Sequence, residues 1–213
     1  GTGVTYAGTT IGDATIAGTD VVAFGRDVIG PGINSSNNWG VWVHDAQGTA
    51  LILQKGAALP FGNPGDVVRS MPSPNAEASG RATFRAEVWN GSTFAYSGIL
   101  AYDRVNGLQR LVRRGDLAPG TSAPYLDVDA PAADPQGRLV FTSSLDTHTG
   151  YNVTGSYDRA VHVLDGGVLQ TIAKSGDPAP GFAANVNLEF IDGAIVDDAG
   201  TVYFDTLVAG PSG

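Results

Sequence analysis

A phenylalanine recurs four times along the chain at almost constant spacing, each time within a run of apolar and β-branched residues. The four positions are separated by 60, 57 and 63 residues, and the position four residues earlier always holds a turn former. An acid stands three residues before each turn glycine, which gives the pattern Asp/Glu-x-x-Gly-x-x-x-Phe. The phenylalanines are Phe24, Phe84, Phe141 and Phe204, the turn residues are Asp20, Gly80, Gly137 and Gly200, and the acids are Glu77, Asp134 and Asp197.

Two further markers keep the same period. The first is a Gly-Asp-x-Ala-Pro-Gly element that begins at Gly56, Gly115 and Gly176, with spacings of 59 and 61 residues. The second is an aspartate that ends an apolar run at Asp45, Asp103 and Asp165, with spacings of 58 and 62 residues. Three markers with one period predict a tandem repeat, and we divide the single domain 1–213 into repeats at about 1–60, 61–120 and 121–181 and a half repeat at 182–213.

Each repeat is expected to contain four short strands. In the third repeat these are 125–129, 138–142, 160–164 and 169–173, and Gly and Asp supply the turn chemistry inside each pair of strands. A lone four-stranded sheet cannot bury both of its faces, so neighbouring repeats must stack, with the phenylalanine as the anchor between them. The sequence therefore predicts an all-β fold of β-propeller or propeller-like type with about three and a half blades. A sandwich would need no fixed period, and the coils of a β-solenoid are usually shorter.

The half repeat has a structural consequence. Half a blade exposes an open sheet edge, which is prone to aggregate unless something covers it. We expect the remaining strands to come from further repeats outside this sequence or from a partner protein.

Composition supports the all-β interpretation and excludes several functions. The chain has 30 Gly and 12 Pro, and only 15% of its residues are charged. A net charge of −9 without a Lys/Arg cluster disfavours nucleic acid as a partner. The absence of cysteine excludes disulfides and thiolate metal sites, and no apolar run is long enough for a membrane span.

The repeated motifs resemble those of the bacterial surface proteins called choice-of-anchor tandem-repeat proteins, which are named for an NxxGxxAF motif. The similar segments are 77–84, 134–141 and 197–204, followed by the Gly-Asp elements at 115–120 and 176–181. Here Asp or Glu replaces the motif asparagine, the alanine before phenylalanine survives only at Ala23-Phe24, and the first Gly-Asp element has become Gly56-Ala57. The resemblance implies export and an extracellular or cell-surface location, and it supplies no catalytic residues.

Several residues carry candidate chemistry beside a structural explanation. The Gly-Asp-x-Ala-Pro-Gly element could be a ligand loop, but its recurrence in each repeat favours a turn between blades. Asp197 and Asp198 could contribute to a Ca²⁺ site, although no run of closely spaced acids is present, and an Asx turn is the simpler interpretation. Asp127 and Asp129 lie on one face of a strand and could be the two carboxylates of a glycosidase.

The histidines and tryptophans give weaker indications. The three histidines, His44, His148 and His162, lie at different repeat positions and lack metal-binding spacing, so no metal or cofactor is expected from them. Three tryptophans near the loops between second and third strands could form a platform for glycans or serve blade packing equally well. They are Trp39, Trp42 and Trp89.

Three N-glycosylation tripeptides fall in the same loop of successive repeats, between the second and third strands. They begin at Asn34, Asn90 and Asn152 and would place glycans on one rim. Loops rich in Asn, Gly and Ser give such tripeptides by composition alone, and both explanations remain open.

Taken together, the sequence predicts an extracellular or cell-surface protein, with the periplasm as the other compartment, that acts as a structural or adhesive interaction module and has no catalytic activity. Two alternatives remain. One is a subunit of a larger surface assembly that a partner chain completes. The other is an exported polysaccharide hydrolase or lyase that uses carboxylates facing a central channel.

Overall fold

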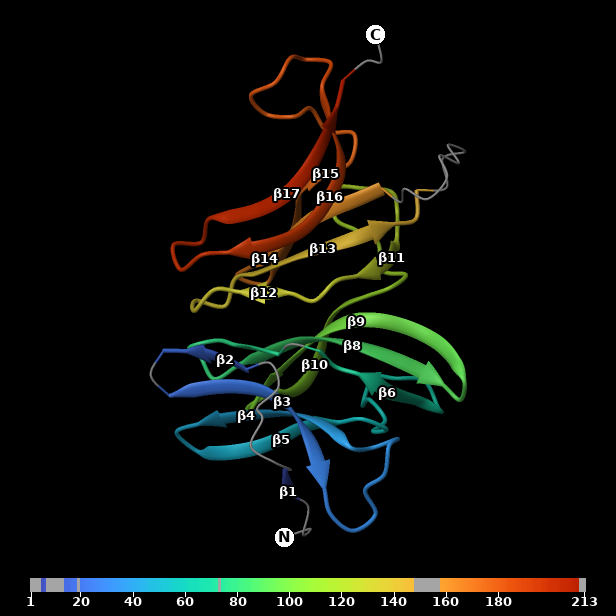
Figure 1. The fold of residues 1–213 in the computed structure, drawn as a ribbon, viewed down its shortest axis with the longest axis vertical. Helices are drawn as coiled ribbons and strands as arrows, with labels where there is room; N and C mark the ends of the chain where they lie inside the picture. The colour runs from blue at the N-terminus through green and yellow to red at the C-terminus, as the bar shows by residue number, and fades with distance from the viewer. Residues whose placement is uncertain (1–4, 7–13, 19, 73, 148–157, 211–213) are drawn as a thin grey trace. The chain divides into compact units, whose positions relative to one another are not determined.

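The computed structural model describes residues 5–6, 14–18, 20–72, 74–147 and 158–210, and every regular element in these ranges is a β-strand (Figure 1). The fold is therefore all-β, as predicted. The strands are β1 (Thr5–Tyr6), β2 (Ala14–Ala17), β3 (Val21–Ile29), β4 (Trp39–Asp45), β5 (Gly48–Gln54), β6 (Asp66–Ser70), β7 (Asn75–Ala76), β8 (Ala82–Asn90), β9 (Thr93–Asp103), β10 (Gly107–Arg113), β11 (Tyr125–Val128), β12 (Ala132–Ala133), β13 (Leu139–Leu145), β14 (Asp158–Asp165), β15 (Val168–Lys174), β16 (Asn187–Val196) and β17 (Val202–Ala209).

Three sheets contain their strands in the same order, and all neighbouring strands are antiparallel. The first sheet has the order β1-β3-β4-β5, the second β6-β8-β9-β10 and the third β11-β13-β14-β15. A short additional strand pairs with the second strand of each, namely β2, β7 and β12. The fourth sheet contains β16 and β17 alone.

The strand register is the same in all four sheets when it is counted from the recurring phenylalanine. The residue four positions after each phenylalanine pairs with the first strand, and the pairs are Tyr6 with Val28, Val68 with Val88, Tyr125 with Leu145 and Leu188 with Val208. On the other side, Phe24, Phe84 and Phe141 lie opposite Trp42, Leu100 and His162 of the third strands. Because one residue of slip would move every side chain to the opposite face, the shared register gives all four sheets the same division of faces.

The Gly-Asp element folds back onto the first strand of the following sheet. Gly115 N–H donates to the Tyr125 carbonyl at 2.8 Å, and Tyr125 N–H donates to the Asp116 carbonyl at 2.9 Å. Equivalent reciprocal bonds join Gly56 and Ala57 to Val68, and Gly176 and Asp177 to Leu188. The alanines at the fourth position of the element, Ala118 and Ala179, are buried, and Leu59 is buried at the corresponding place.

The turns between strands follow the turn chemistry of the sequence, with one correction. Asp103 ends β9 and its Oδ1 accepts hydrogen bonds from the Val105 and Asn106 amides, as expected for an Asx turn. In the second sheet, the expected Asn/Gly/Ser-rich loop between second and third strands is only a two-residue turn, Gly91-Ser92, which joins β8 to β9. Gly91 is the first residue of this turn and has a φ of +59°, the positive φ that two-residue hairpin turns require at that position.

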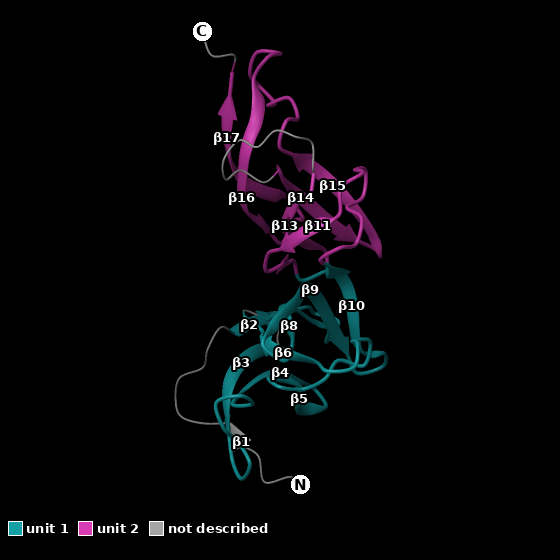
Figure 2. Ribbon diagram, turned by 90° about the vertical axis from the view of Figure 1, so that its right-hand side faces the viewer, with its two compact units in different colours: residues 1–113, 135–137 teal, residues 114–134, 138–213 magenta. Residues whose placement is uncertain are grey.

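The described residues form two compact units, which Figure 2 colours separately: unit 1 contains 1–113 and 135–137, and unit 2 contains 114–134 and 138–213. In unit 1 the first and second sheets pack face to face. Phe84 and Val88 of β8 contact a cluster that includes Val41 of β4 and Leu53 of β5. A second cluster joins Ala23 and Val43 of the first sheet to Ala76 and Ala82 of the second.

In unit 2 the third sheet packs against the β16–β17 ribbon. Val140 of β13 and Val161 of β14 contact Leu188 and Ile191 of β16, with partly buried residues of β17, including Phe204, at the margin. The recurring phenylalanines consequently differ in burial. Phe84 and Phe141 are buried, whereas Phe24 and Phe204 are half-buried.

Candidate functional site

The clearest candidate for an interaction site is the face of the β16–β17 ribbon that no sheet of the described residues covers. Large apolar side chains point into solvent from both of its strands. They include Ile195, Tyr203 and Leu207, which are 62%, 53% and 62% exposed. A contiguous exposed apolar surface on a folded protein typically marks a contact site for another molecule.

Comparison of equivalent positions shows that this exposure is particular to the fourth sheet. The residue before each recurring phenylalanine is 0% exposed in the other sheets (Ala23, Thr83 and Val140), but Tyr203 is 53% exposed. On the opposite face, the residue four positions after each phenylalanine is 1%, 1% and 2% exposed in the other sheets (Val28, Val88 and Leu145), whereas Val208 is 37% exposed. The β17 strand thus carries apolar residues at positions that are buried in the equivalent strands β3, β8 and β13, but in β17 these positions are exposed to solvent.

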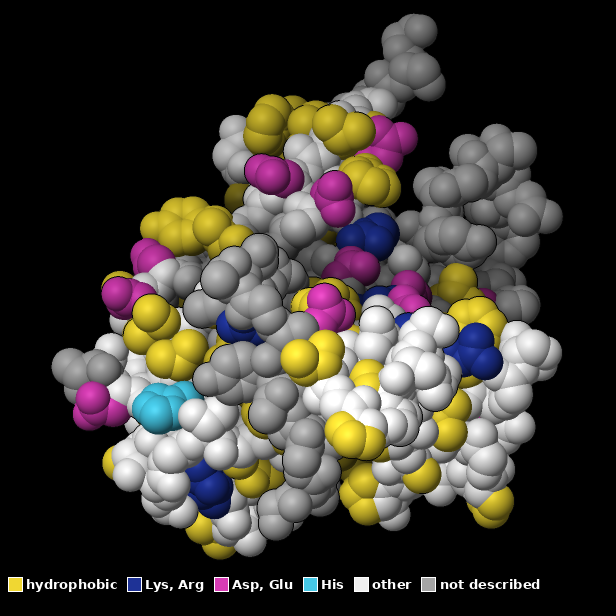
Figure 3. Space-filling view, turned by 60° about the horizontal axis from the view of Figure 1, so that its bottom comes forward, with side chains coloured by type: hydrophobic (Ala, Val, Ile, Leu, Met, Phe, Trp, Pro, Cys, Tyr) yellow, Lys and Arg dark blue, Asp and Glu magenta, His cyan; other side chains and the backbone are white. Residues whose placement is uncertain are grey.

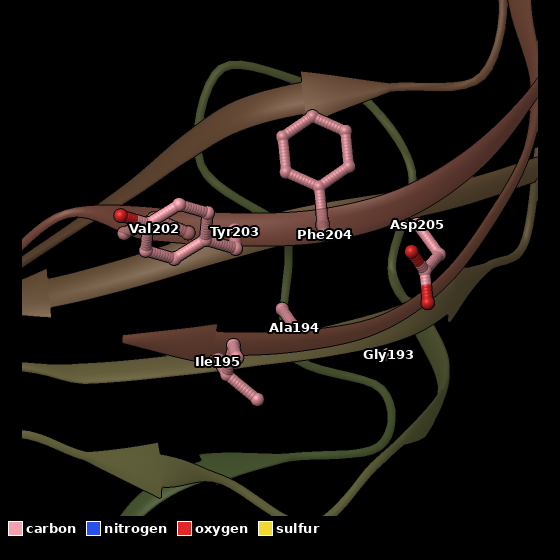
Figure 4. Close-up of a pocket in the computed structure, with 7 residues that line it drawn as sticks. All are labelled: Gly193, Ala194, Ile195, Val202, Tyr203, Phe204 and Asp205. Carbon is pink, nitrogen blue, oxygen red and sulfur yellow. The ribbon is translucent and has the colours of Figure 1, made fainter. Parts of the chain in front are cut away.

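A shallow hollow of about 570 Å³ lies on this ribbon. Its walls are segments 193–195 of β16 and 202–205 of β17, which Figure 4 draws as sticks. Ile195 and Tyr203 are cross-strand partners, and Figure 4 shows them on neighbouring strands, while the Phe204 ring projects in another direction. The hollow is open and mostly apolar in its lining, which suits the side chains of another protein segment.

Asp197 is engaged at the turn that joins the two strands. Its Oδ1 accepts hydrogen bonds from the Ala199 and Thr201 amides, and its Oδ2 accepts one from the Tyr203 hydroxyl at 3.1 Å. These bonds, led by the backbone bond from Thr201, lower the pKa of the carboxyl. Asp197 therefore forms the Asx turn that the sequence indicated, and its carboxylate accepts hydrogen bonds from three donors. Within the described ranges, no group of three or more His, Cys, Asp or Glu side chains is arranged to hold a metal ion.

The two carboxylates considered for glycoside cleavage have partners inside unit 2. Asp129 Oδ2 lies 2.6 Å from the Arg159 guanidinium and accepts a hydrogen bond from the Thr142 hydroxyl at 2.6 Å. Arg159 also donates to the Ile191 carbonyl at 2.7 Å, which ties β14 to β16. Asp127 accepts a hydrogen bond from the Val128 amide. This arrangement stabilises the stacking of the third sheet on the ribbon, because a charged donor binds two strands and a loop carboxylate at once.

His162 lies in the interior of unit 2. It is 0% exposed, stacks on Phe141 and contacts Ser143 Oγ through Nε2 at 2.8 Å and Thr171 Oγ1 through Nδ1 at 3.0 Å. Burial lowers its pKa to about 4, so the ring is neutral at physiological pH. The Ser143–His162 pair resembles a nucleophile and its base only in residue type, because no substrate can reach a fully buried serine. His44 is exposed on β4, where it bonds Thr49, and His148 lies outside the described residues.

The tryptophan rings are engaged in contacts with other residues of the protein. Trp42 is buried and stacks on Phe24 with ring centroids 6.4 Å apart, and Trp39 donates to the Met71 carbonyl. Trp89 packs edge to face on Phe94, and the Arg69 guanidinium lies 5.1 Å from its ring centroid. Trp39 and Trp42 lie on β4 of the first sheet, and Trp89 lies on β8 of the second.

The candidate glycosylation residues differ in their surroundings. Asn34 is exposed in the loop between β3 and β4, where its Oδ1 accepts hydrogen bonds from Ser36. The Asn90 amide donates to the Pro64 carbonyl and to Asp66 Oδ1, so its nitrogen is already engaged. Asn152 lies outside the described residues.

Acidic, basic and apolar side chains are interspersed on the face drawn in Figure 3, and its described residues show no continuous basic patch. None of the described elements is a helix that could cross a membrane.

Sequence reasoning missed the Arg159 network and the contrast in exposure at Tyr203. Arg159 is an isolated arginine whose partners lie 30 and 32 residues away, so no local signal marks it. The contrast at Tyr203 could have been found by aligning the four phenylalanine segments, because only the fourth places a tyrosine directly before phenylalanine.

Over its described residues, the chain is an all-β protein of several antiparallel sheets, with an apolar sheet face exposed on β16–β17. Residues 2–213 match the family described as "Family of unknown function (DUF7453)", and the chain belongs to this family. A comparison with curated proteins gives no match.

Proposed function

We propose that the protein is a tandem-repeat, propeller-like scaffold that acts outside the cell or at its surface as a structural or adhesive interaction module without catalytic activity. The observation that carries this proposal is the uncovered apolar face of the β16–β17 ribbon, with Ile195, Tyr203 and Leu207 exposed on it. Monomeric proteins rarely leave such a surface open unless it binds something.

The strand topology supports the repeat. Three sheets have one strand order, and all four keep one register relative to Phe24, Phe84, Phe141 and Phe204. Within each unit, sheets stack face to face, as a sheet with two apolar faces requires. These features support an arrangement in successive blades, and the resemblance to repeat-bearing surface proteins supports the extracellular location.

The chemistry of the polar side chains favours binding over catalysis. Asp129 pairs with Arg159, Asp197 caps its own turn, and His162 is buried with hydroxyl partners. A polysaccharide hydrolase would need two carboxylates held around an accessible bond, and Asp127 and Asp129 have other partners. The second candidate function, a subunit of a larger surface assembly, is favoured by the same uncovered ribbon.

Two measurements test the proposal together. Antibody labelling of intact and permeabilised producing cells should show the protein on intact cells. Incubation of the purified protein with a panel of polysaccharides should release no reducing or unsaturated sugar ends. Labelling only after permeabilisation would contradict the location, and sugar release that the Asp129→Asn variant abolishes would contradict the absence of catalysis.

A further inference from the structure

The outer edge of β17 lacks the neighbour that the equivalent strands possess. β3, β8 and β13 each pair with a third strand on the side away from the first strand. In the part of the chain that the structure describes, β17 pairs only with β16. An open edge of this kind presents backbone donors and acceptors in register for an added strand.

We propose that this edge binds a β-hairpin of another polypeptide segment, whose first strand adds antiparallel to β17 and whose side chains form cross-strand pairs with those of β17, Tyr203 and Leu207 included. This inference rests on the proposed role as an interaction module and names the partner's chemistry.

The register of the other sheets defines the first strand of that hairpin. Opposite the residue after each recurring phenylalanine stands a buried β-branched residue, namely Val41, Ile99 or Val161, each 0% exposed. Opposite the phenylalanine itself stands Trp42, Leu100 or His162. The partner strand should therefore place a β-branched residue opposite Asp205 and a bulky residue opposite Phe204.

Charge adds a second requirement. Segment 187–209 contains five acidic residues and no Lys or Arg, namely Glu189, Asp192, Asp197, Asp198 and Asp205. A hairpin with an excess of positive charge is therefore complementary. The chain's own β9–β10 hairpin satisfies both requirements, because segment 93–113 contains Ile99 and Leu100 together with three arginines and one aspartate.

The test uses a synthetic peptide of residues 93–113 as the probe and the 213-residue chain as the receptor. Titration of labelled peptide should give saturable binding, and bound peptide should slow amide hydrogen exchange in β17 at least tenfold. A peptide of the same composition in scrambled order should do neither. If the peptide leaves β17 exchange unchanged, a fusion that appends residues 93–113 after Gly213 through a Gly/Ser linker supplies the hairpin at high effective concentration. Unchanged exchange in the fusion as well would overturn the proposal.

Matched variants locate the site. Tyr203→Glu, on the uncovered face, should weaken peptide binding at least tenfold, and Leu207→Glu should act likewise. Ile172→Glu replaces an apolar residue on β15 that is 46% exposed and should leave binding unchanged. Equal weakening by all three variants would show non-specific charge repulsion and contradict the assignment.

One further outcome would show that a second copy of the chain, and not a hairpin of another segment, binds the edge of β17. If the protein alone shows concentration-dependent dimers by light scattering and slow exchange in β17, a second copy fills the edge and the hairpin proposal is wrong. Cell-surface labelling and the polysaccharide assay do not depend on β17, so failure of the edge proposal can be distinguished from failure of the proposed function.

Discussion

The four recurring phenylalanines hold the same position in their sheets, but two are buried and two are half-buried. The degree of burial decides how much each side chain contributes to stability. Phe141 is 2% exposed and contacts Tyr125 and His162, with ring centroids 6.2 and 4.9 Å away. Phe204 is half-buried at the margin of the unit 2 cluster. Removal of a buried ring loses the free energy of its transfer out of water and leaves an internal cavity. Removal of a half-buried ring loses less transfer free energy and leaves a space that solvent can fill.

We therefore predict that Phe141→Ala lowers the free energy of unfolding by about 4 kcal/mol and Phe204→Ala by less than about 2 kcal/mol. Urea denaturation of the two variants beside the native chain measures both values. Equal losses would show that Phe204 is as well covered in solution as Phe141.

His162 gives a prediction about pH. Its pKa of about 4 in the folded protein lies below the ordinary value of 6.5 because burial disfavours the charged ring. The unfolded chain therefore binds a proton at higher pH than the folded chain does. The contribution of His162 to stability is complete above pH 6.5 and declines as pH falls toward 4, by roughly 3 kcal/mol in all.

Denaturant titrations between pH 7 and pH 4 measure this decline. His162→Leu, which introduces the residue found at Leu100 in the second sheet, should make stability less dependent on pH over that interval. The variant also removes the ring's bonds to Ser143 and Thr171, so its absolute stability can fall without affecting the test. An unchanged slope would mean that the ring titrates normally in the folded state.

At the scale of elements, the turns are the part of the fold that the sequence predicts best. The glycines before the second strands, Gly80, Gly137 and Gly200, and those that open the Gly-Asp element, Gly56, Gly115 and Gly176, all have φ between +82° and +90°. Only glycine reaches this conformation without strain, so the position of each glycine identifies a reversal of the chain.

Two of these glycines form a matched pair for mutation. Gly115 and Gly137 have the same φ of +90°, so alanine costs both the same backbone strain, about 1–2 kcal/mol. A Cβ at Gly115 meets no atom within 4 Å, whereas a Cβ at Gly137 would lie 2.7 Å from Oε2 of buried Glu77. Gly137→Ala should thus be the more destabilising by at least about 1 kcal/mol, as measured by thermal or urea unfolding. Equal effects would show that the Glu77 side chain moves aside without cost.

The short strands β1, β2, β7 and β12 were not predicted, for a physical reason. Three of them have only two residues, too few to display an alternating pattern, and the four-residue β2 combines Ala and Thr with a single large apolar residue, Ile16. The sequence also did not predict that β16 would extend over 10 residues. In the third sheet, the corresponding region is divided into two separate strands, β11 and β12. Strands with strong apolar runs were placed more closely: β14 was predicted within two residues at each end, and β13 within one residue at its start and three at its end.

At the scale of the whole molecule, the sequence predicted an all-β chain with strands in a repeated order, and the described structure is all-β with three sheets of one order. What it could not predict is which surfaces are covered. Ala23, Thr83, Val140 and Tyr203 hold the same place in their strands, yet only Tyr203 is exposed. Local sequence determines which way a side chain points, and only the packing of neighbouring sheets determines whether it is buried.

The central claim is that the first and second strands of all four sheets pair in one register relative to the recurring phenylalanine. Nuclear Overhauser contacts across the first and second strands test it most directly, because each reports a single cross-strand pair. The account predicts cross-strand contacts at Tyr6–Val28, Val68–Val88, Tyr125–Leu145 and Leu188–Val208 alike. A register shifted by even one residue in any of the four would contradict it.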